Sequence, residues 1–251
     1  LQIEHADLSL IGHREENQDR VAIAIGDDAA FLAVVDGMGG HADGARAAEV
    51  AIRTMIEQFW EASRPLFDPD GFLHLTLGLA HEAVVALGRG LPQEIRPRAT
   101  CAACVVQGSN AYWAHIGDSR VYMLRGGRIL ERTRDHSHVE LLLRSGRITE
   151  QQAHDHPMRN YVECCIGGDP ALPEMSLGGR RALRPGGRLI LRDGARAETD
   201  AHRNVHRWER FATRVEIRLK GKEKGQIVLA FETNDDFERL LNLGEEWSSE
   251  Y

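Results

Sequence analysis

Apolar and polar residues alternate along the chain in a pattern that predicts strands and helices in a layered order. Two apolar runs in residues 21–37, separated by the turn "GDD", predict two consecutive strands. Residues 42–62 and about 71–88 have apolar positions at helical spacing, and so predict two helices. The remaining elements are four short strands, a further helical stretch and one last strand, over residues 100–133, 137–155 and 187–194. Strands with two helices inserted between them favour an α+β domain over alternating βαβ units.

The C-terminal part of the chain differs in composition from the rest. The chain's lysines are Lys220, Lys222 and Lys224, whereas residues 1–219 use arginine as their strong base. We therefore expect a first domain over residues 1–195, a linker or amphipathic helix over 196–211, and a small module over 212–251. The module reads as strand, hairpin, strand and helix. Because two strands and a helix hide little apolar surface, the module should pair with a copy of itself or dock on the first domain.

Composition narrows the functional classes. The chain has 251 residues and a formal net charge of −7, which gives no reason to expect nucleic acid bound over most of its surface. Cys101 and Cys104 lie in the apolar run "TCAACVV", without a second C-x-x-C or a histidine pair, so they indicate packed strand residues rather than a disulfide or a zinc site. With no long apolar segment and no leader-like start, we expect a soluble cytoplasmic protein.

Four aspartates lie at or beside the ends of predicted strands. They are Asp19, Asp36, Asp118 and Asp193. Each one alone is explained by a turn or cap, since aspartate is common in turns. Four carboxylates meeting at one rim would instead need cations, and hard oxygen ligands suit Mg²⁺ or Mn²⁺. Bound cations of this kind allow metal-assisted hydrolysis of a phosphoryl group by an activated water.

The matching segments "GHREENQDR", "VVDGMGGHADGARAAEVA", "IGDSRVYMLRGGRI", "TRDHS" and "LRPGGRLILRDG" appear in one order along the chain. On these motifs, residues 8–195 resemble the bacterial members of the PPM-type metal-dependent serine/threonine protein phosphatases. The resemblance implies a β-sandwich of two antiparallel sheets flanked by helices, with two central Mg²⁺ or Mn²⁺ ions, and a third weaker one, in the cleft between the sheets. It also implies phosphorylated proteins as substrates and a flap over residues 137–175 beside the cleft.

The same resemblance assigns metal-binding roles to individual residues. Asp36 and the carbonyl of Gly37 would bind the central metals, and Asp19 would hold one of them through water. Asp118 would serve the third metal, and Asp193 would bridge to the central pair.

Two further residues receive roles in binding substrate and transferring protons. Arg14 would hold the substrate phosphate in a bidentate contact. His41 is either a polar residue at a helix entrance or a general acid. The first alternative is favoured because Met38 occupies the place where other members carry histidine.

The chain departs from the family pattern near residue 195. The strand ending at Asp193 is one residue shorter, with Arg192 beside the ligand, and the family's final Asp-Asn is absent, so the fold is incomplete at its C-terminal end. The retained Arg14, Asp19, Asp36 and Asp118 nevertheless favour a phosphatase that acts on phosphoserine and phosphothreonine in proteins. The alternative is a catalytically impaired phosphatase-like domain that works as a dimeric binding or regulatory protein. A third reading makes the junction a fusion or frameshift scar.

Residues 212–243 resemble the C-terminal dimerisation module of ParB-type partition proteins. This resemblance implies a homodimer, in which Lys220, Lys222 and Lys224 form a basic edge that could touch DNA phosphates. The alternative is a solvated hairpin tip, where lysines are ordinary.

Overall fold

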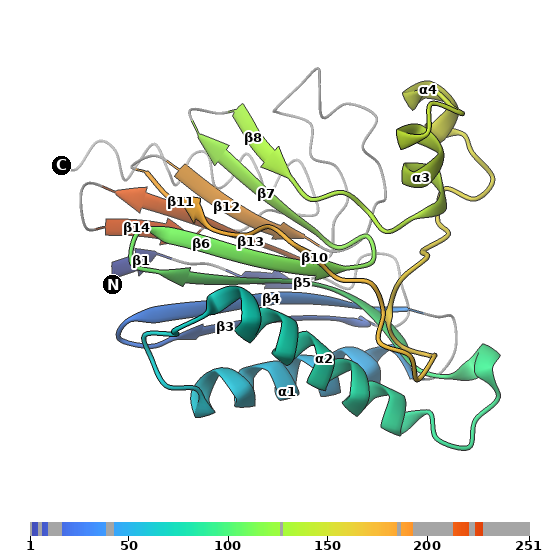
Figure 1. Ribbon diagram of the computed structural model, residues 1–251, viewed down its shortest axis with the longest axis horizontal. Coiled ribbons are helices and arrows are strands. Elements are labelled where there is room, and N and C mark those ends of the chain that lie inside the picture. The colour runs from blue at the N-terminus through green and yellow to red at the C-terminus, as the bar shows by residue number, and fades with distance from the viewer. Residues whose placement is uncertain are drawn as a thin grey trace.

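The chain folds into two β-sheets packed face to face, with two long helices covering the outer face of one of them (Figure 1). The computed structural model describes residues 2–4, 7–9, 17–38, 43–125, 128–184, 187–192, 213–220 and 224–227. This arrangement confirms the expected α+β class and the sandwich of two sheets flanked by helices.

The sheet that carries the helices, called sheet B, places β4 between the buried strand β5 and the partly exposed edge strand β3. Its members are β3 (Asp19–Ile25), β4 (Ala29–Met38), β5 (Arg98–Gln107), β6 (Asn110–Ile116), β9 (Ile166–Gly167), β10 (Ser176–Leu177) and β11 (Arg181–Ala182). The order is β10-β6-β5-β4-β3, with β11 also on β6 and β9 on β5. Along β4, Phe31, Ala33 and Val35 pack toward the helices, whereas Leu32 and Val34 pack between the sheets. Both faces of β4 are therefore buried, and the period of two decides which core each side chain joins.

Two long helices cover sheet B, close to where the sequence places them. They are α1 (Gly44–Glu61) and α2 (Pro69–Leu87), followed by the short η1 (Gln93–Ile95). Asp68 caps α2 by accepting a hydrogen bond from the Gly71 N–H at 3.0 Å, and Pro69 suits the first turn because its missing N–H needs no partner there. The rings of Phe31 and Phe59 stack 5.7 Å apart and join α1 to β4.

The second sheet, called sheet A, includes strands from both ends of the chain. Its members are β1 (Gln2–Glu4), β2 (Asp7–Ser9), β7 (Arg120–Arg125), β8 (Arg128–Arg132), β12 (Gly187–Arg192), β13 (Thr213–Lys220) and β14 (Lys224–Ile227). The order is β1-β14-β13-β12-β7-β8, with β2 on β13. The β1–β14 pair is parallel, and the other pairings among the described strands are antiparallel.

The tail strands β13 and β14 dock on the first domain, which is one of the two placements expected for them. β13 pairs with β12 from Arg188↔Arg218 to Arg192↔Arg214, and β14 continues the sheet beyond it. The linker at 196–211 and the helix expected near the C-terminus lie outside the described residues. A separate module over 212–251 stays a prediction.

The helical stretch expected over 137–155 is two short helices, α3 (His138–Arg144) and α4 (Glu150–His154). Gly146, with φ of 68°, follows the last turn of α3, a conformation that favours glycine and ends a helix. Thr149 then starts α4 with a capping box completed by Gln152. The two caps break one amphipathic pattern into two helices, which lie at one end of the sandwich, apart from α1 and α2 (Figure 1).

Cys101 and Cys104 are fully buried on opposite faces of β5, which confirms that they are packed strand residues. Among the described helices, none combines the length and apolar character that crossing a bilayer requires. The cytoplasmic location stays a prediction.

Candidate metal centre

Asp19 and Asp36 lie directly opposite each other at one end of sheet B. They form the first cross-strand pair of the β3–β4 ladder, and Thr100 on β5 lies opposite Asp36 on its other side. Asp36 continues the series of Leu32 and Val34, so the alternation of the strand directs its side chain to the space between the sheets. Directly opposed residues have Cβ atoms about 5 Å apart, so the ladder holds the two carboxylates as neighbours where the apolar core ends.

The pair of carboxylates fits a hard divalent cation. Asp19 is only 4% exposed, and its backbone N–H donates to Asn17 Oδ1 at 2.9 Å. Two like charges held side by side near a buried edge are costly unless cations or hydrogen bonds compensate them. Carboxylate and carbonyl oxygens are the ligands that Mg²⁺ and Mn²⁺ prefer, so the residues present fit such an ion.

Gly37 is required by the approach of α1 to the end of β4. A Cβ atom on Gly37 would lie 2.2 Å from the Gly44 carbonyl oxygen and 2.7 Å from that of Gln18. The Gly37 N–H donates to the Gln18 carbonyl at 3.1 Å, so the segment preceding β3 is joined to the same point. The glycine therefore lets the first turn of α1 contact the strand immediately beyond Asp36.

Asp118 reaches the same end of the molecule on a tight turn between β6 and β7. Gly117 before it has φ of 91°, and a Cβ atom there would lie 2.4 Å from Thr100 Cγ2. Ser119 after it is fully buried, with its hydroxyl 2.8 Å from that of Thr100. Since Thr100 is the cross-strand neighbour of Asp36, these contacts place the Asp118 turn next to the Asp19–Asp36 pair.

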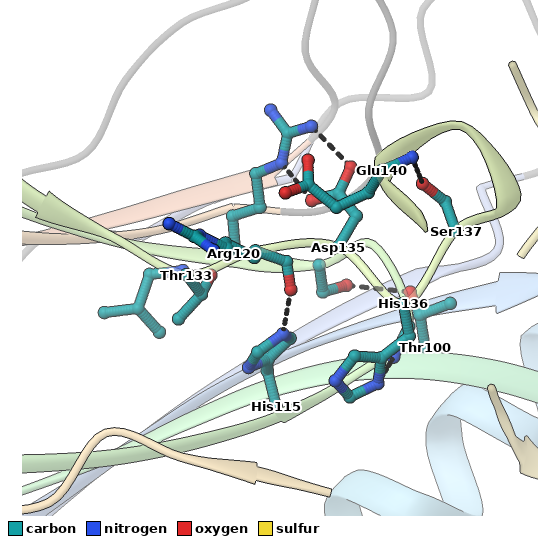
Figure 2. A network of polar contacts seen from close by, with 12 residues as sticks. Thr100, His115, Arg120, Thr133, Asp135, His136, Ser137 and Glu140 are labelled. Carbon is teal, nitrogen blue, oxygen red and sulfur yellow. Dashed lines mark hydrogen bonds and ion pairs between the residues drawn. The ribbon is translucent and has the colours of Figure 1, made fainter. Parts of the chain in front are cut away.

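Two histidines, His115 and His136, stack with ring centroids 4.6 Å apart (Figure 2), and His136 contacts the turn that carries Asp118. His115 Nε2 lies 2.6 Å from the Arg134 carbonyl oxygen, which only accepts, so that nitrogen carries the proton. His136 Nδ1 accepts from the Gly117 N–H at 3.2 Å, and its Nε2 lies 2.8 Å from Ser176 Oγ.

Burial decides the charge of both rings. Burial, and next the neighbouring His136, lower the pKa of His115 to about 4. Burial also lowers the pKa of His136. Both rings are therefore neutral near pH 7, which matches the hydrogen bonds that they make.

A buried ion pair holds the segment that carries His136. Arg120 contacts Asp135 through two nitrogens, at 2.5 Å each, and each side chain is 7% exposed (Figure 2). Arg120 also donates to the Tyr122 hydroxyl at 3.2 Å. Residues on both sides of Asp118 are therefore attached to the segment 133–137.

A pocket opens beyond the carboxylates, between the start of α1 and the segment before β5. Met38, Asp43, Arg96 and Arg98 are among the residues that line it. Met38 and Arg98 form the last cross-strand pair of the β4–β5 ladder, two residues beyond Asp36 and Thr100. The pocket therefore lies beyond Asp36 along β4, and charged groups of both signs line it.

Of the predicted site residues, the structure places Asp19 opposite Asp36 with Gly37 next to it, and Asp118 on the turn that contacts Thr100 beside Asp36. Within the described ranges, no group of three histidine, cysteine, aspartate or glutamate side chains is close enough to hold an ion by itself. Arg14, His41, Asp193 and Lys222 lie outside the described residues, and their roles stay predictions. Lys220 and Lys224 form a cross-strand pair where β13 and β14 meet, and their DNA contact also stays a prediction.

Sequence reasoning missed the polar residues that support Asp118. They are Thr100, His115, Ser119, Arg120, Asp135 and His136. The strings "GDSR" and "TRDHS" contain four of them, but these strings mark only turns and loops unless the contact between two segments 15 to 19 residues apart is known.

Comparison with known proteins places this arrangement among phosphatases. Residues 9–163 match the family model for protein phosphatase 2C. The serine/threonine protein phosphatase PstP of Mycobacterium tuberculosis is 32% identical over 178 residues, which cover 71% of this chain and 33% of that protein. This chain therefore spans about a third of the length of that relative.

Solved structures agree with the sequence comparison. The serine/threonine phosphatase Stp1 of Staphylococcus aureus superposes with a TM-score of 0.67 and 25% identity, covering 77% of this chain and 76% of that one. The PstP catalytic domain in complex with two manganese ions gives a TM-score of 0.60 and 28% identity, covering 75% of this chain and 76% of that one. Together with the opposed Asp19 and Asp36, these matches show that the chain belongs to the protein phosphatase 2C family.

Proposed function

We propose that the protein is a Mg²⁺- or Mn²⁺-dependent phosphatase that hydrolyses phosphoserine and phosphothreonine in proteins. The observation that carries the proposal is the direct opposition of Asp19 and Asp36 on the face of sheet B between the two sheets. Membership of the phosphatase family and the two manganese ions of the PstP catalytic domain support it.

Different residues would bind the metal ions, the phosphate and the leaving group. Asp36, the Gly37 carbonyl and Asp19 would hold the two central ions, with Asp118 serving a third and Asp193 completing the set. The ions, when bound, lower the pKa of a coordinated water and neutralise charge on the phosphoryl oxygens. Arg14 would orient the phosphate, and His41 remains the candidate for protonating the leaving alcohol.

The test is hydrolysis of a small aryl phosphate and of phosphoserine and phosphothreonine peptides as Mn²⁺ is titrated. We expect saturable turnover in the wild type and a loss of at least about a thousandfold in kcat/KM for Asp36→Asn. Asp28→Asn is the matched control, because Asp28 is an exposed turn residue on the opposite end of β4. Calorimetric Mn²⁺ binding to both variants, with thermal unfolding of the metal-free proteins, separates loss of the ion from loss of the fold.

Two outcomes contradict the proposal. Full activity of Asp36→Asn would remove that residue from the metal centre. A folded wild type that binds Mn²⁺ but hydrolyses none of the substrates would favour the alternative of an impaired phosphatase-like binding protein.

The homodimer and the weak DNA contact of the tail form a separate proposal, supported by the residue pattern over 212–243. Sedimentation of the full chain, and of a variant with Lys220, Lys222 and Lys224 replaced by glutamine, tests both parts. Both parts would be rejected if the protein stays monomeric at every concentration and does not bind duplex DNA at low salt.

A further inference from the structure

His136 connects the Asp118 turn to two other parts of the chain. Its Nδ1 accepts from the Gly117 N–H at 3.2 Å, and its own backbone N–H donates to the Gly117 carbonyl at 2.9 Å. Its Nε2 is 2.8 Å from Ser176 Oγ on β10, and its carbonyl accepts from the Glu163 N–H at 2.7 Å. One residue therefore contacts the turn, the strand beside β6 and the end of the segment that carries α3 and α4.

Each ring nitrogen of His136 has a defined role. Nδ1 accepts a hydrogen bond from a backbone N–H, so it carries no proton, and Nε2–H donates to the serine hydroxyl. The two positions can therefore be removed separately by substitution. His136 contacts the turn at Gly117, the residue that precedes Asp118.

We propose that His136 is a positioning residue that fixes the backbone of the turn at Gly117 through Nδ1, and so sets where the Asp118 carboxylate stands relative to Asp36. The inference rests on the proposed function, because it takes Asp118 as a carboxylate of the metal centre. In this role His136 binds no ion itself, but it sets the affinity of the site that binds its ion most weakly.

The geometry supports this role from both sides of Asp118. Gly117 adopts a φ of 91°, which side-chain-bearing residues rarely adopt, and is buried, so its N–H needs an acceptor inside the protein. Ser119 is held from the other side by Thr100. Without His136 Nδ1, the buried Gly117 N–H loses its acceptor, and only the bond from the His136 backbone N–H to the Gly117 carbonyl holds that end of the turn, so Asp118 is positioned less firmly.

The same residue extends this effect to the flap. Ser137, next to His136, bridges to Val162 and caps α3 by accepting from the Glu140 N–H at 3.3 Å (Figure 2). Both ends of the segment 138–163 therefore lie at His136. A displacement of that segment would shift His136, and with it the Asp118 turn.

Three single variants test the proposal. In His136→Asn, the amide oxygen stands near the position of Nδ1 and can accept from Gly117. In His136→Gln, the amide stands near the position of Nε2 and can reach Ser176 but not Gly117. Ser176→Ala removes the partner of Nε2 alone. Removing a residue that orients a metal ligand typically weakens metal binding by about tenfold or more.

We expect His136→Gln to raise the Kd of the weakest Mn²⁺ site about tenfold, measured by calorimetry, while His136→Asn and Ser176→Ala stay within about twofold. Amide hydrogen exchange at Gly117 in the metal-free protein is the second readout. It should accelerate in His136→Gln and stay slow in His136→Asn.

The outcomes are distinct from those of the proposed function. Equal Mn²⁺ affinity and equal Gly117 exchange in the Asn and Gln variants would overturn the positioning role, whether or not the enzyme turns over. Loss of Mn²⁺ binding in Asp36→Asn with a normal Gly117 amide would concern the central metals alone. Thermal unfolding of each variant excludes simple loss of fold.

Discussion

Asp36 and Asp118 reach the same end of the molecule by different means. Asp36 is placed by the backbone, because hydrogen-bonded strands on both sides fix its register against Asp19 and Thr100. Asp118 is placed mainly by side chains, because one backbone bond from the His136 N–H to the Gly117 carbonyl is joined by the His136 ring, the Thr100–Ser119 contact and the Arg120–Asp135 pair. A carboxylate held by a ladder tolerates changes in neighbouring side chains, whereas one held by a turn depends on them.

We call the contacts around Asp36 the ladder side and those around Asp118 the turn side. The largest loss of stability should follow when the buried Arg120–Asp135 pair on the turn side is broken. Asp135→Asn leaves the Arg120 guanidinium buried beside a neutral amide, so we expect the free energy of unfolding to fall by about 3 to 5 kcal/mol. Chemical denaturation of the metal-free protein measures it.

The chain offers a matched control with the same bidentate geometry at the surface. Arg181 contacts Glu131 at 2.6 and 2.8 Å, but the two side chains are 39% and 36% exposed. Glu131→Gln should cost less than about 1 kcal/mol, because water compensates the remaining charge. Equal costs for Asp135→Asn and Glu131→Gln would show that the turn does not depend on its buried charges.

The turn side should also lose stability in acid through His115. Its pKa is lowered to about 4 in the folded protein by burial and by His136, whereas an unfolded histidine titrates near its ordinary value. The unfolded state therefore binds more protons between these values, so stability falls as the pH drops from about 6.5 to about 4. The full contribution is about 3 kcal/mol.

His115→Gln isolates this effect, since its amide can donate to the Arg134 carbonyl but does not titrate. The difference in unfolding free energy between wild type and variant should decrease from pH 7.5 to pH 4. A constant difference across that range would mean that His115 is not buried in its neutral form.

The ladder side was predictable from the sequence because strand periodicity is local. The alternation through Leu32, Val34 and Asp36 gives the face of the strand, and "VVDGMGG" gives its end. The sequence also indicated the strands that follow, since their turns carry glycine, as at Gly108.

The turn side was not predictable, because its contacts join residues distant in sequence. Nothing in "TRDHS" alone shows that His136 accepts from Gly117, 19 positions earlier, or that Asp135 pairs with Arg120. The role of Gly37 was also only partly foreseen. The family resemblance assigns only its carbonyl to the metals, whereas the structure shows that the Gly44 oxygen fills the space where a side chain would begin.

Gly37→Ala tests the ladder side through backbone spacing. A Cβ atom 2.2 Å from the Gly44 oxygen must push α1 away from β4, so we expect a loss of about 2 kcal/mol, within the usual range for overpacking. Gly78→Ala in the middle of α2 is the control, because its nearest neighbour would be Leu172 Cδ1 at 3.8 Å. That variant should gain about 0.5 to 1 kcal/mol in thermal unfolding. A neutral Gly37→Ala would show that α1 can shift without cost.

The smallest effect should come from the contact that joins the two sides, Thr100 to Ser119. Their hydroxyls are 2.8 Å apart and both residues are at most 1% exposed. Thr100→Val and Ser119→Ala should each cost about 1 kcal/mol, with a coupling of similar size in the double-mutant cycle, because each single variant leaves one buried hydroxyl without this partner. The Mn²⁺ affinity of the weakest site should fall in both variants while the central sites keep theirs. If the two variants instead weaken all Mn²⁺ sites equally, Asp36 depends on its neighbours as much as Asp118 does, and the distinction between ladder and turn fails.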